Sequence, residues 1–130
     1  MTTHSVRVLI LEHTTPLADL AAEILQREPS LQIVGAFDSY AALTAQLPHT
    51  QSDVVILDLD TPDACGLNVI PFVLANLPDA RIILLRDQED SRYSKAALKL
   101  GAAVCVRKDL IATDLVPAVL HALSSRAPRV

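Results

Sequence analysis

Charged side chains stand directly after several aliphatic stretches of this sequence. These residues are Glu12 and His13, Asp58 and Asp60, Arg86, and Lys108. Carboxylates beside a lysine suit a hard cation together with a phosphoryl group. A carboxylate can also be a nucleophile and become an aspartyl phosphate. These residue types therefore predict phosphoryl chemistry, provided that the fold brings them together.

Strand and helix patterns alternate five times along the chain. Residues 53–58 give the strongest strand signal, because an uninterrupted aliphatic run is typical of a central strand buried on both faces. Pro71 and Pro117 are expected in first turns of helices, where a missing N–H costs little. Gly101 is expected to cap a helix. The predicted strands are 6–11, 31–36, 53–58, 81–86 and 103–107. The predicted helices run from Thr15 to Pro29, from a cap at Asp38 or Ser39 to Pro48, from about Asn68 to Leu77, from 89 to 100, and from Thr113 to about Ser124.

Alternation of this kind predicts parallel strands, right-handed crossovers and helices on both faces of one sheet. In open α/β sheets, ligand sites lie beyond the carboxyl ends of the strands, so the charged residues listed above are expected in one crevice. A chain of 130 residues supports one domain. We place this domain at residues 1–124, with a tail or the start of a linker at 125–130.

Composition argues against several function classes. The formal net charge is −4 without any basic run, which argues against a nucleic-acid-binding surface on this chain. No apolar run approaches the roughly 18 residues of a membrane span, and the first residues lack a signal-peptide pattern. We therefore expect a cytoplasmic protein that does not enter the membrane.

Five segments carry a family resemblance. They are RVLILE at 7–12, DVVILDLDTP at 53–62, GL at 66–67, ARIILL at 80–85, and GAA with KD at the two ends of 101–109. In this order and spacing the chain resembles a response-regulator receiver domain, over residues from about 6 to 124. The match is best to the subfamily that usually precedes a helix-turn-helix output domain.

The resemblance implies a flavodoxin-like (βα)5 fold with a five-stranded parallel sheet of order 2-1-3-4-5. It implies that Asp58 is the phosphoacceptor position in a two-component phosphorelay, with a sensor histidine kinase as donor and Mg²⁺ as cofactor. Lys108 would contact the phosphoryl oxygens. Glu12, Asp58 and the backbone carbonyl of Asp60 would bind the metal.

Three positions depart from the family pattern. His13 replaces an acid that normally ligates the metal, Arg86 replaces the switch Thr or Ser, and Cys105 replaces an aromatic residue that turns with that switch. Imidazole suits Zn, Cu, Fe or Ni better than Mg²⁺, so the degenerate ligand position argues against Mg²⁺. For His13 itself, the sequence favours a polar strand-end residue over a metal ligand.

A charge count suggests what replaces the metal. Glu12 and Asp58 are opposed by Lys108 and Arg86, so the expected site is neutral when His13 is neutral. Opposite charges ~4 Å apart gain roughly 4 kcal/mol at an effective dielectric of 20, before desolvation is subtracted. We therefore hypothesise that Arg86 bends into the crevice, pairs with Asp58 or Glu12, and holds one conformation without phosphate.

The interpretation that we favour is an atypical receiver, a regulatory module and not a turnover enzyme, which keeps Asp58 and can work without phosphorylation. One alternative is an ordinary Mg²⁺-dependent phosphoacceptor that controls transcription through an output domain. Another is a small flavin or nucleotide binder on the same fold, although the loop at 12–16 has no glycine for close approach to a phosphate. A haloacid-dehalogenase-like phosphatase fits Asp58 and Asp60 locally, but that core is larger than this chain.

A homodimer is also expected. Helix 89–100, strand 103–107 and the last helix form the usual dimerisation face of receivers. Mixed charge on this face allows a symmetric, salt-sensitive dimer, and is equally typical of a solvated surface.

Overall fold

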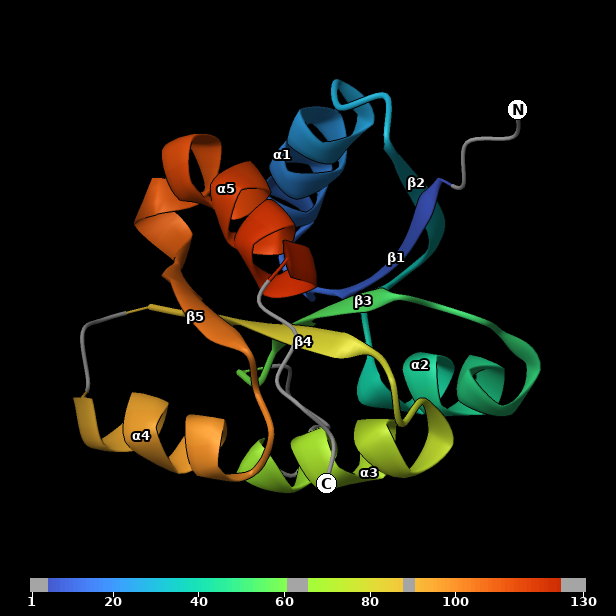
Figure 1. The fold of residues 1–130 in the computed structure, drawn as a ribbon, viewed down its shortest axis with the longest axis vertical. Helices are drawn as coiled ribbons and strands as arrows, with labels where there is room; N and C mark the ends of the chain where they lie inside the picture. The colour runs from blue at the N-terminus through green and yellow to red at the C-terminus, as the bar shows by residue number, and fades with distance from the viewer. Residues whose placement is uncertain (1–4, 61–65, 88–90, 125–130) are drawn as a thin grey trace.

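Five parallel strands form one sheet in the computed structural model, which describes residues 5–60, 66–87 and 91–124 (Figure 1). The strands are β1 (Val6–Leu11), β2 (Leu31–Phe37), β3 (Val54–Asp58), β4 (Arg81–Arg86) and β5 (Val104–Arg107). Their order is β2-β1-β3-β4-β5, and every neighbouring pair is parallel. The predicted flavodoxin-like strand order is therefore confirmed.

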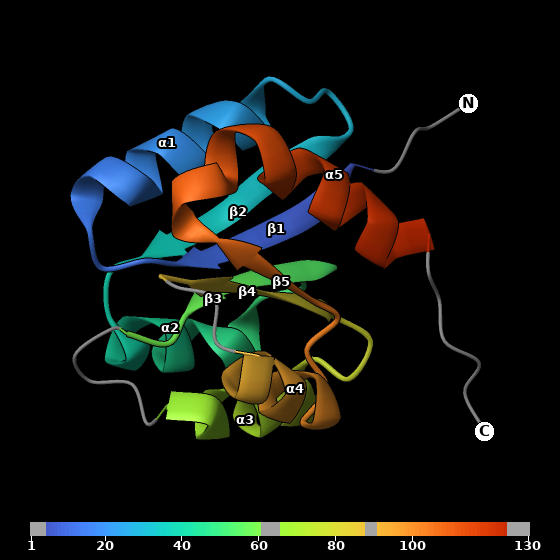
Figure 2. The same cartoon turned by 90° about the vertical axis from the view of Figure 1, so that its left-hand side faces the viewer.

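Helices cover both faces of this sheet. One face carries α1 (Thr15–Gln26) and α5 (Ile111–Ser124), which lie side by side (Figures 1 and 2). The opposite face carries α2 (Tyr40–Gln46), α3 (Val69–Asn76) and α4 (Ser91–Lys99). Short 3-10 turns at Leu47–His49, Gly66–Asn68 and Lys108–Leu110 adjoin these elements. The result is the predicted three-layer arrangement of helices, sheet and helices.

The alternation of side chains along β3 builds the cores on both faces. Val55 and Leu57 belong to the cluster beneath α2, α3 and α4, whereas Val54 and Ile56 belong to the cluster beneath α1 and α5. All four side chains are fully buried, and so is Asp58 at the end of the strand. An aliphatic strand therefore delivers a carboxylate to a position without solvent contact.

Several predicted helix limits are confirmed. The side chain of Ser39 caps α2 by accepting a hydrogen bond from a backbone N–H. Pro71 lies in the first turn of α3, where its missing N–H is not needed. After α4, Gly101 has φ +118°, and the N–H of Ala102 donates to the carbonyl of Ala97 at 3.0 Å. Gly101 thus ends the helix as predicted.

The start of α5 differs from its prediction. The helix begins at Ile111, not at Thr113, directly after the turn Lys108–Leu110. Pro117 consequently lies inside the helix and not in its first turn, so its missing N–H removes one helical hydrogen bond. The physical reason is burial: Ile111 is fully buried in the same cluster as Leu115, which extends the apolar face of the helix by one turn.

Some predicted segments lie outside the described residues. These are positions 89 and 90 at the start of the predicted helix 89–100, and the tail at 125–130. The described part of the chain contains no helix that is long and apolar enough to cross a membrane.

Candidate functional site

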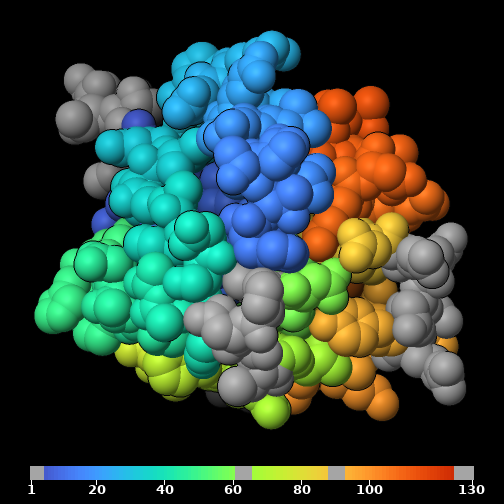
Figure 3. Space-filling model, turned by 180° about the vertical axis from the view of Figure 1, so that it is seen from behind, coloured from blue at the N-terminus to red at the C-terminus, as the bar shows by residue number. Residues whose placement is uncertain are grey.

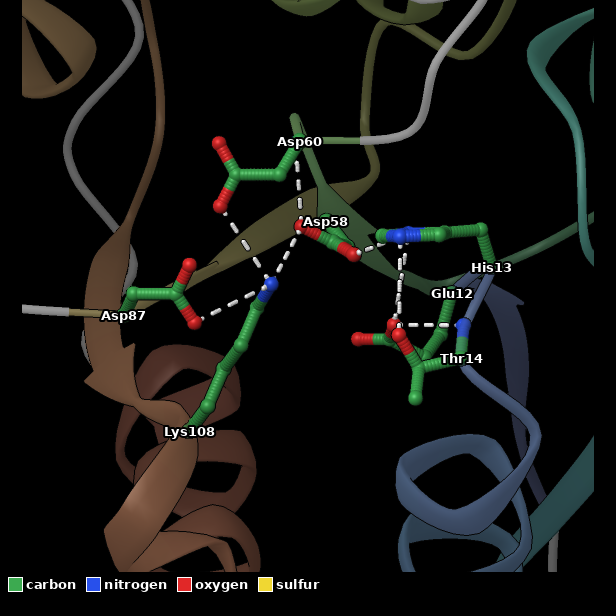
Figure 4. A network of polar contacts seen from close by, with 7 residues as sticks. All are labelled: Glu12, His13, Thr14, Asp58, Asp60, Asp87 and Lys108. Carbon is green, nitrogen blue, oxygen red and sulfur yellow. Dashed lines mark hydrogen bonds and ion pairs between the residues drawn. The ribbon is translucent and has the colours of Figure 1, made fainter.

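The carboxyl ends of β1, β3 and β5 bring charged side chains together at one edge of the sheet (Figure 4). Glu12 and His13 directly follow β1, Asp58 ends β3, and Lys108 follows β5. The parallel pairing of the strands aligns these ends, which is why residues distant in sequence meet there. Of the residues that the sequence placed in this crevice, Glu12, His13, Asp58, Asp60 and Lys108 lie together in one network.

Each carboxylate oxygen of Asp58 has a partner within the chain. Oδ1 accepts a hydrogen bond from the backbone N–H of Asp60 at 3.0 Å and lies 2.8 Å from Nζ of Lys108. Oδ2 lies 3.0 Å from Nδ1 of His13. Asp58 therefore links the segment after β1 to the segment after β5.

Charge pairing keeps Asp58 ionised although it is buried. Burial alone would raise the pKa of Asp58, but the ammonium of Lys108, the adjacent Glu12 and the N–H of Asp60 together lower it below its usual value. Burial likewise disfavours the charged form of Lys108, yet Asp58 raises the pKa of this lysine above its usual value. The two residues form a buried ion pair at neutral pH.

Lys108 gathers two further carboxylates around its ammonium. Its Nζ lies 3.3 Å from Oδ2 of Asp60 and 3.5 Å from Oδ1 of Asp87, while its side chain is only 8% exposed. Asp87 was not predicted as a site residue, although it directly follows β4 and so shares the position that marked the other candidates. The predicted metal contact of the Asp60 carbonyl stays a prediction.

Glu12 is buried beside Asp58 with a raised pKa. Its Oε1 accepts a hydrogen bond from the backbone N–H of Thr14 at 3.0 Å. Its Oε2 has no hydrogen-bond partner among the described residues. Burial, followed by the neighbouring Asp58 carboxylate, raises the pKa of Glu12 to about 7.

His13 directs its ring toward the carboxylates. Nδ1 lies 3.0 Å from Asp58 and 3.7 Å from Oε1 of Glu12, and Nε2 lies 3.5 Å from Oγ1 of Thr14. The side chain remains 32% exposed. His13 is therefore part of the network around Asp58, and its role as a polar strand-end residue and not a metal ligand stays a prediction.

Arg86 lies at the end of the strand next to the one that carries Asp58. It is the last residue of β4, and the register sets it beside Arg107 of β5. His13 lies 3.7 Å from Glu12 and 3.0 Å from Asp58, and Lys108 lies 2.8 Å from Asp58. The hypothesis that Arg86 pairs with one of these carboxylates stays a prediction.

The donor set suits Mg²⁺ poorly. Glu12, His13 and Asp58 each offer a ligand atom, and these atoms lie within 4.8 Å of one another. Mg²⁺ demands near-octahedral oxygen coordination, whereas one of these three donors is an imidazole nitrogen. Receiver domains bind Mg²⁺ at acidic residues, so this chain keeps the acids Glu12 and Asp58 and changes the third donor.

A family model described as the response regulator receiver domain matches residues 8–120. The DNA-binding transcriptional activator DevR/DosR of Mycobacterium tuberculosis is 28% identical over 114 residues, which cover 88% of this chain and 52% of that protein. A protein-glutamate methylesterase/protein-glutamine glutaminase of Caulobacter vibrioides is 31% identical and is matched over 95% of this chain and 38% of its own length. The chain thus spans about half or less of these relatives.

Solved receiver structures have the same fold. The signal receiver domain of NarL from Mycobacterium tuberculosis superposes with a TM-score of 0.80 at 28% identity, covering 95% of this chain and 99% of that one. The non-phosphorylated receiver domain of RcsB from Escherichia coli gives 0.88 at 24% identity, covering 97% of this chain and all of that one. None of these relatives favours the flavin-binding alternative. With the family model matched along most of its length, the chain belongs to the response regulator receiver domains of two-component signalling.

Proposed function

We propose that this receiver is a regulatory module whose state is set at Asp58 without Mg²⁺-dependent phosphorylation. Asp58 occupies the phosphoacceptor position in this proposal. The supporting observation is the closed network in which both oxygens of Asp58 are engaged by Lys108, His13 and the N–H of Asp60.

Phosphorylation would require Asp58 to present a lone pair to a phosphorus atom. One oxygen faces His13 at 3.0 Å and the other faces Lys108 at 2.8 Å, so an incoming phosphoryl group would compete with these contacts. Two positions of the family pattern are also changed, one that binds the metal and one that relays the arrival of the phosphoryl group. His13 stands for the metal-binding acid, and Arg86 stands for the switch hydroxyl.

The network connects three segments of the fold. His13 ties the segment between β1 and α1 to β3, and Lys108 ties the segment between β5 and α5 to the same carboxylate (Figure 4). A protein or small molecule that binds better when one contact is open would shift the population toward the open arrangement. The module would therefore signal through contacts at this edge.

An ordinary phosphoacceptor is a second candidate, favoured by the ionisation of Asp58. The lowered pKa of Asp58 keeps the nucleophile deprotonated, and Lys108 stands 2.8 Å away. In this candidate a sensor histidine kinase supplies the phosphoryl group, and Lys108 balances the charge on its oxygens. The metal ligands would be Glu12, Asp58 and the carbonyl of Asp60.

Partners follow from the surface and from the length of the relatives. We propose that the chain acts through an output domain or a separate protein, because it spans only 52% of DevR/DosR, a DNA-binding activator. The net charge of −4 favours a protein partner over nucleic acid for this chain itself.

The exposed side chains Leu98, Leu110 and Leu120 make α4, the turn after β5 and α5 the candidate dimer face. Sedimentation of Leu110→Asp against wild type tests this face.

Intact-mass spectrometry after incubation with acetyl phosphate separates the two candidates. Samples with Mg²⁺ and with EDTA are compared, and Asp58→Asn is the control. The proposal predicts no phosphoryl adduct on folded wild-type protein under conditions that modify an ordinary receiver. A single adduct that needs both Mg²⁺ and Asp58 would establish the ordinary phosphoacceptor instead.

A further inference from the structure

We propose that Glu12, His13 and Asp58 form a binding site for a divalent first-row transition ion such as Zn²⁺, selected over Mg²⁺ by the imidazole of His13. This inference concerns the ion that the site takes. It stands whether or not Asp58 is phosphorylated, so the two proposals can fail separately.

The three donors are already placed near one point. Nδ1 of His13 lies 3.0 Å from Oδ2 of Asp58 and 3.7 Å from Oε1 of Glu12. Two donors bound to one Zn²⁺ at roughly 2.0–2.2 Å stand about 3.0–3.5 Å apart at octahedral or tetrahedral angles. Small side-chain shifts would therefore close these atoms around an ion.

The second oxygen of Glu12 is an independent indication of a ligand. Glu12 is 1% exposed, and within the described part of the chain its Oε2 has no hydrogen-bond partner. In Figure 4 this oxygen points away from Thr14 and toward the side of the site where Lys108 lies. A buried carboxylate oxygen without a donor is costly, and a cation bound beside it would supply the missing interaction.

The charge around the site also favours a cation. The carboxylates in the network are those of Glu12, Asp58, Asp60 and Asp87. Four ionised carboxylates against the one ammonium of Lys108 leave a formal charge of −3 with His13 neutral, and counting Arg86 leaves −2. If Glu12 is protonated in the absence of a metal, each total is one unit less negative, and the site still carries negative charge. The neutral total expected from the sequence left out Asp60 and Asp87, which the structure brings to Lys108.

The surroundings of His13 suit a metal-bound imidazole. A ligating histidine usually donates its other ring N–H to a nearby oxygen, which orients the ring. Oγ1 of Thr14 lies 3.5 Å from Nε2 and can accept that hydrogen bond when Nδ1 binds the ion. Transition ions accept a mixed nitrogen and oxygen donor set, which Mg²⁺ disfavours. The imidazole of His13 would therefore cause the site to select transition ions over Mg²⁺.

A cavity borders two of the three proposed ligands, Glu12 and His13. It has a volume of about 320 Å³ and is lined by Glu12, His13, Thr15, Phe37 and Asp38, among others. On the face seen in Figure 3, it lies where the blue residues of α1 meet the cyan residues of β2 and α2. His13 is 32% exposed, so an ion can approach it from solvent, whereas Glu12 is buried at the wall of this cavity.

The test is a titration of the metal-free chain with Zn²⁺, Co²⁺ and Mg²⁺ by calorimetry, with the visible absorption of bound Co²⁺ as a second readout. We expect one site that prefers Zn²⁺ to Mg²⁺. His13→Ala should weaken Zn²⁺ binding by at least about tenfold, since loss of a residue that only orients a ligand already costs about 10–100-fold. His13→Asp should restore an all-oxygen set and shrink the ratio of Zn²⁺ to Mg²⁺ affinity by at least about tenfold.

His121→Ala is the matched control, because His121 is an exposed histidine in the last turn of α5. It should leave Zn²⁺ affinity and the Co²⁺ spectrum unchanged. The proposal is overturned if His13→Ala binds Zn²⁺ as tightly as wild type, or if Mg²⁺ binds wild type as tightly as Zn²⁺. A ¹⁵N spectrum of wild type gives a test that needs no variant: Zn²⁺ must shift the Nδ1 resonance of His13, and an unshifted resonance contradicts ligation.

Discussion

Nδ1 of His13 lies 3.0 Å from Oδ2 of Asp58, so the residue that replaces an acid of the receiver pattern contacts the phosphoacceptor position directly. A second acid at position 13 would add negative charge beside Asp58. The imidazole instead offers a hydrogen bond, and Lys108 holds the other oxygen at 2.8 Å. This exchange of an acid for a histidine underlies both proposals.

The ion pair of Asp58 with Lys108 should dominate the local stability of the site. Lys108→Met would leave a fully buried carboxylate without its closest cation. We expect the free energy of unfolding to fall by about 3 kcal/mol, as when one partner of a buried pair is removed. Urea unfolding measures it. In the double variant with Asp58→Asn, part of this loss should be recovered, and strictly additive losses would contradict the pairing.

Glu12 should make the protein less stable as the pH rises from about 4.5 to 7. Its pKa is about 7 in the folded chain and 4.5 ordinarily, so the folded state binds more protons than the unfolded state in this window. The contribution of Glu12 to the free energy of unfolding is therefore complete below pH 4.5 and is lost as the pH passes 7.

Urea unfolding in metal-free buffer across this pH range measures the effect, with Glu12→Gln for comparison. Glutamine does not titrate, so the difference between wild type and Glu12→Gln should change across the window. A difference that stays constant from pH 4.5 to 7 would mean that the pKa of Glu12 is not raised.

Two glycines with positive φ should respond differently to alanine. Gly101 has φ +118°, and a Cβ there would meet Cδ1 of Leu74, whereas Gly66 has φ +61° and nothing within 4 Å of the added atom. We expect Gly66→Ala to cost about 1 kcal/mol and Gly101→Ala clearly more, because the latter adds a collision to backbone strain. Thermal unfolding of both variants compares them, and equal melting temperatures would contradict this account.

The fold was predictable because long aliphatic stretches can only be strands buried on both faces here. The aliphatic run before Asp58 marks the central strand, and the prolines and the glycine mark where helices begin or end. Together they leave few possible folds. The start of α5 was not predictable from these limits. Thr113 followed by Asp114 is typical of a helix start, and only the buried position of Ile111 shows that the helix begins earlier.

The site was predictable as a set of strand ends but not as a set of contacts. Strand order brings Glu12, Asp58 and Lys108 together whatever their side chains do. Which polar or positively charged side chain reaches Asp58 depends on the direction in which each side chain points. The hydrophobic periodicity of the sequence carries no information on that direction. The contact of His13 with Asp58 was therefore not predicted.

The most direct test of the central claim compares wild type with His13→Asp in acetyl phosphate and Mg²⁺, by intact-mass spectrometry. If the histidine removes Mg²⁺-dependent chemistry from this site, wild type should stay unmodified. His13→Asp should gain one phosphoryl adduct, which disappears when Asp58→Asn is added. A wild-type adduct that forms as fully as that of His13→Asp, and needs Mg²⁺, would contradict the account.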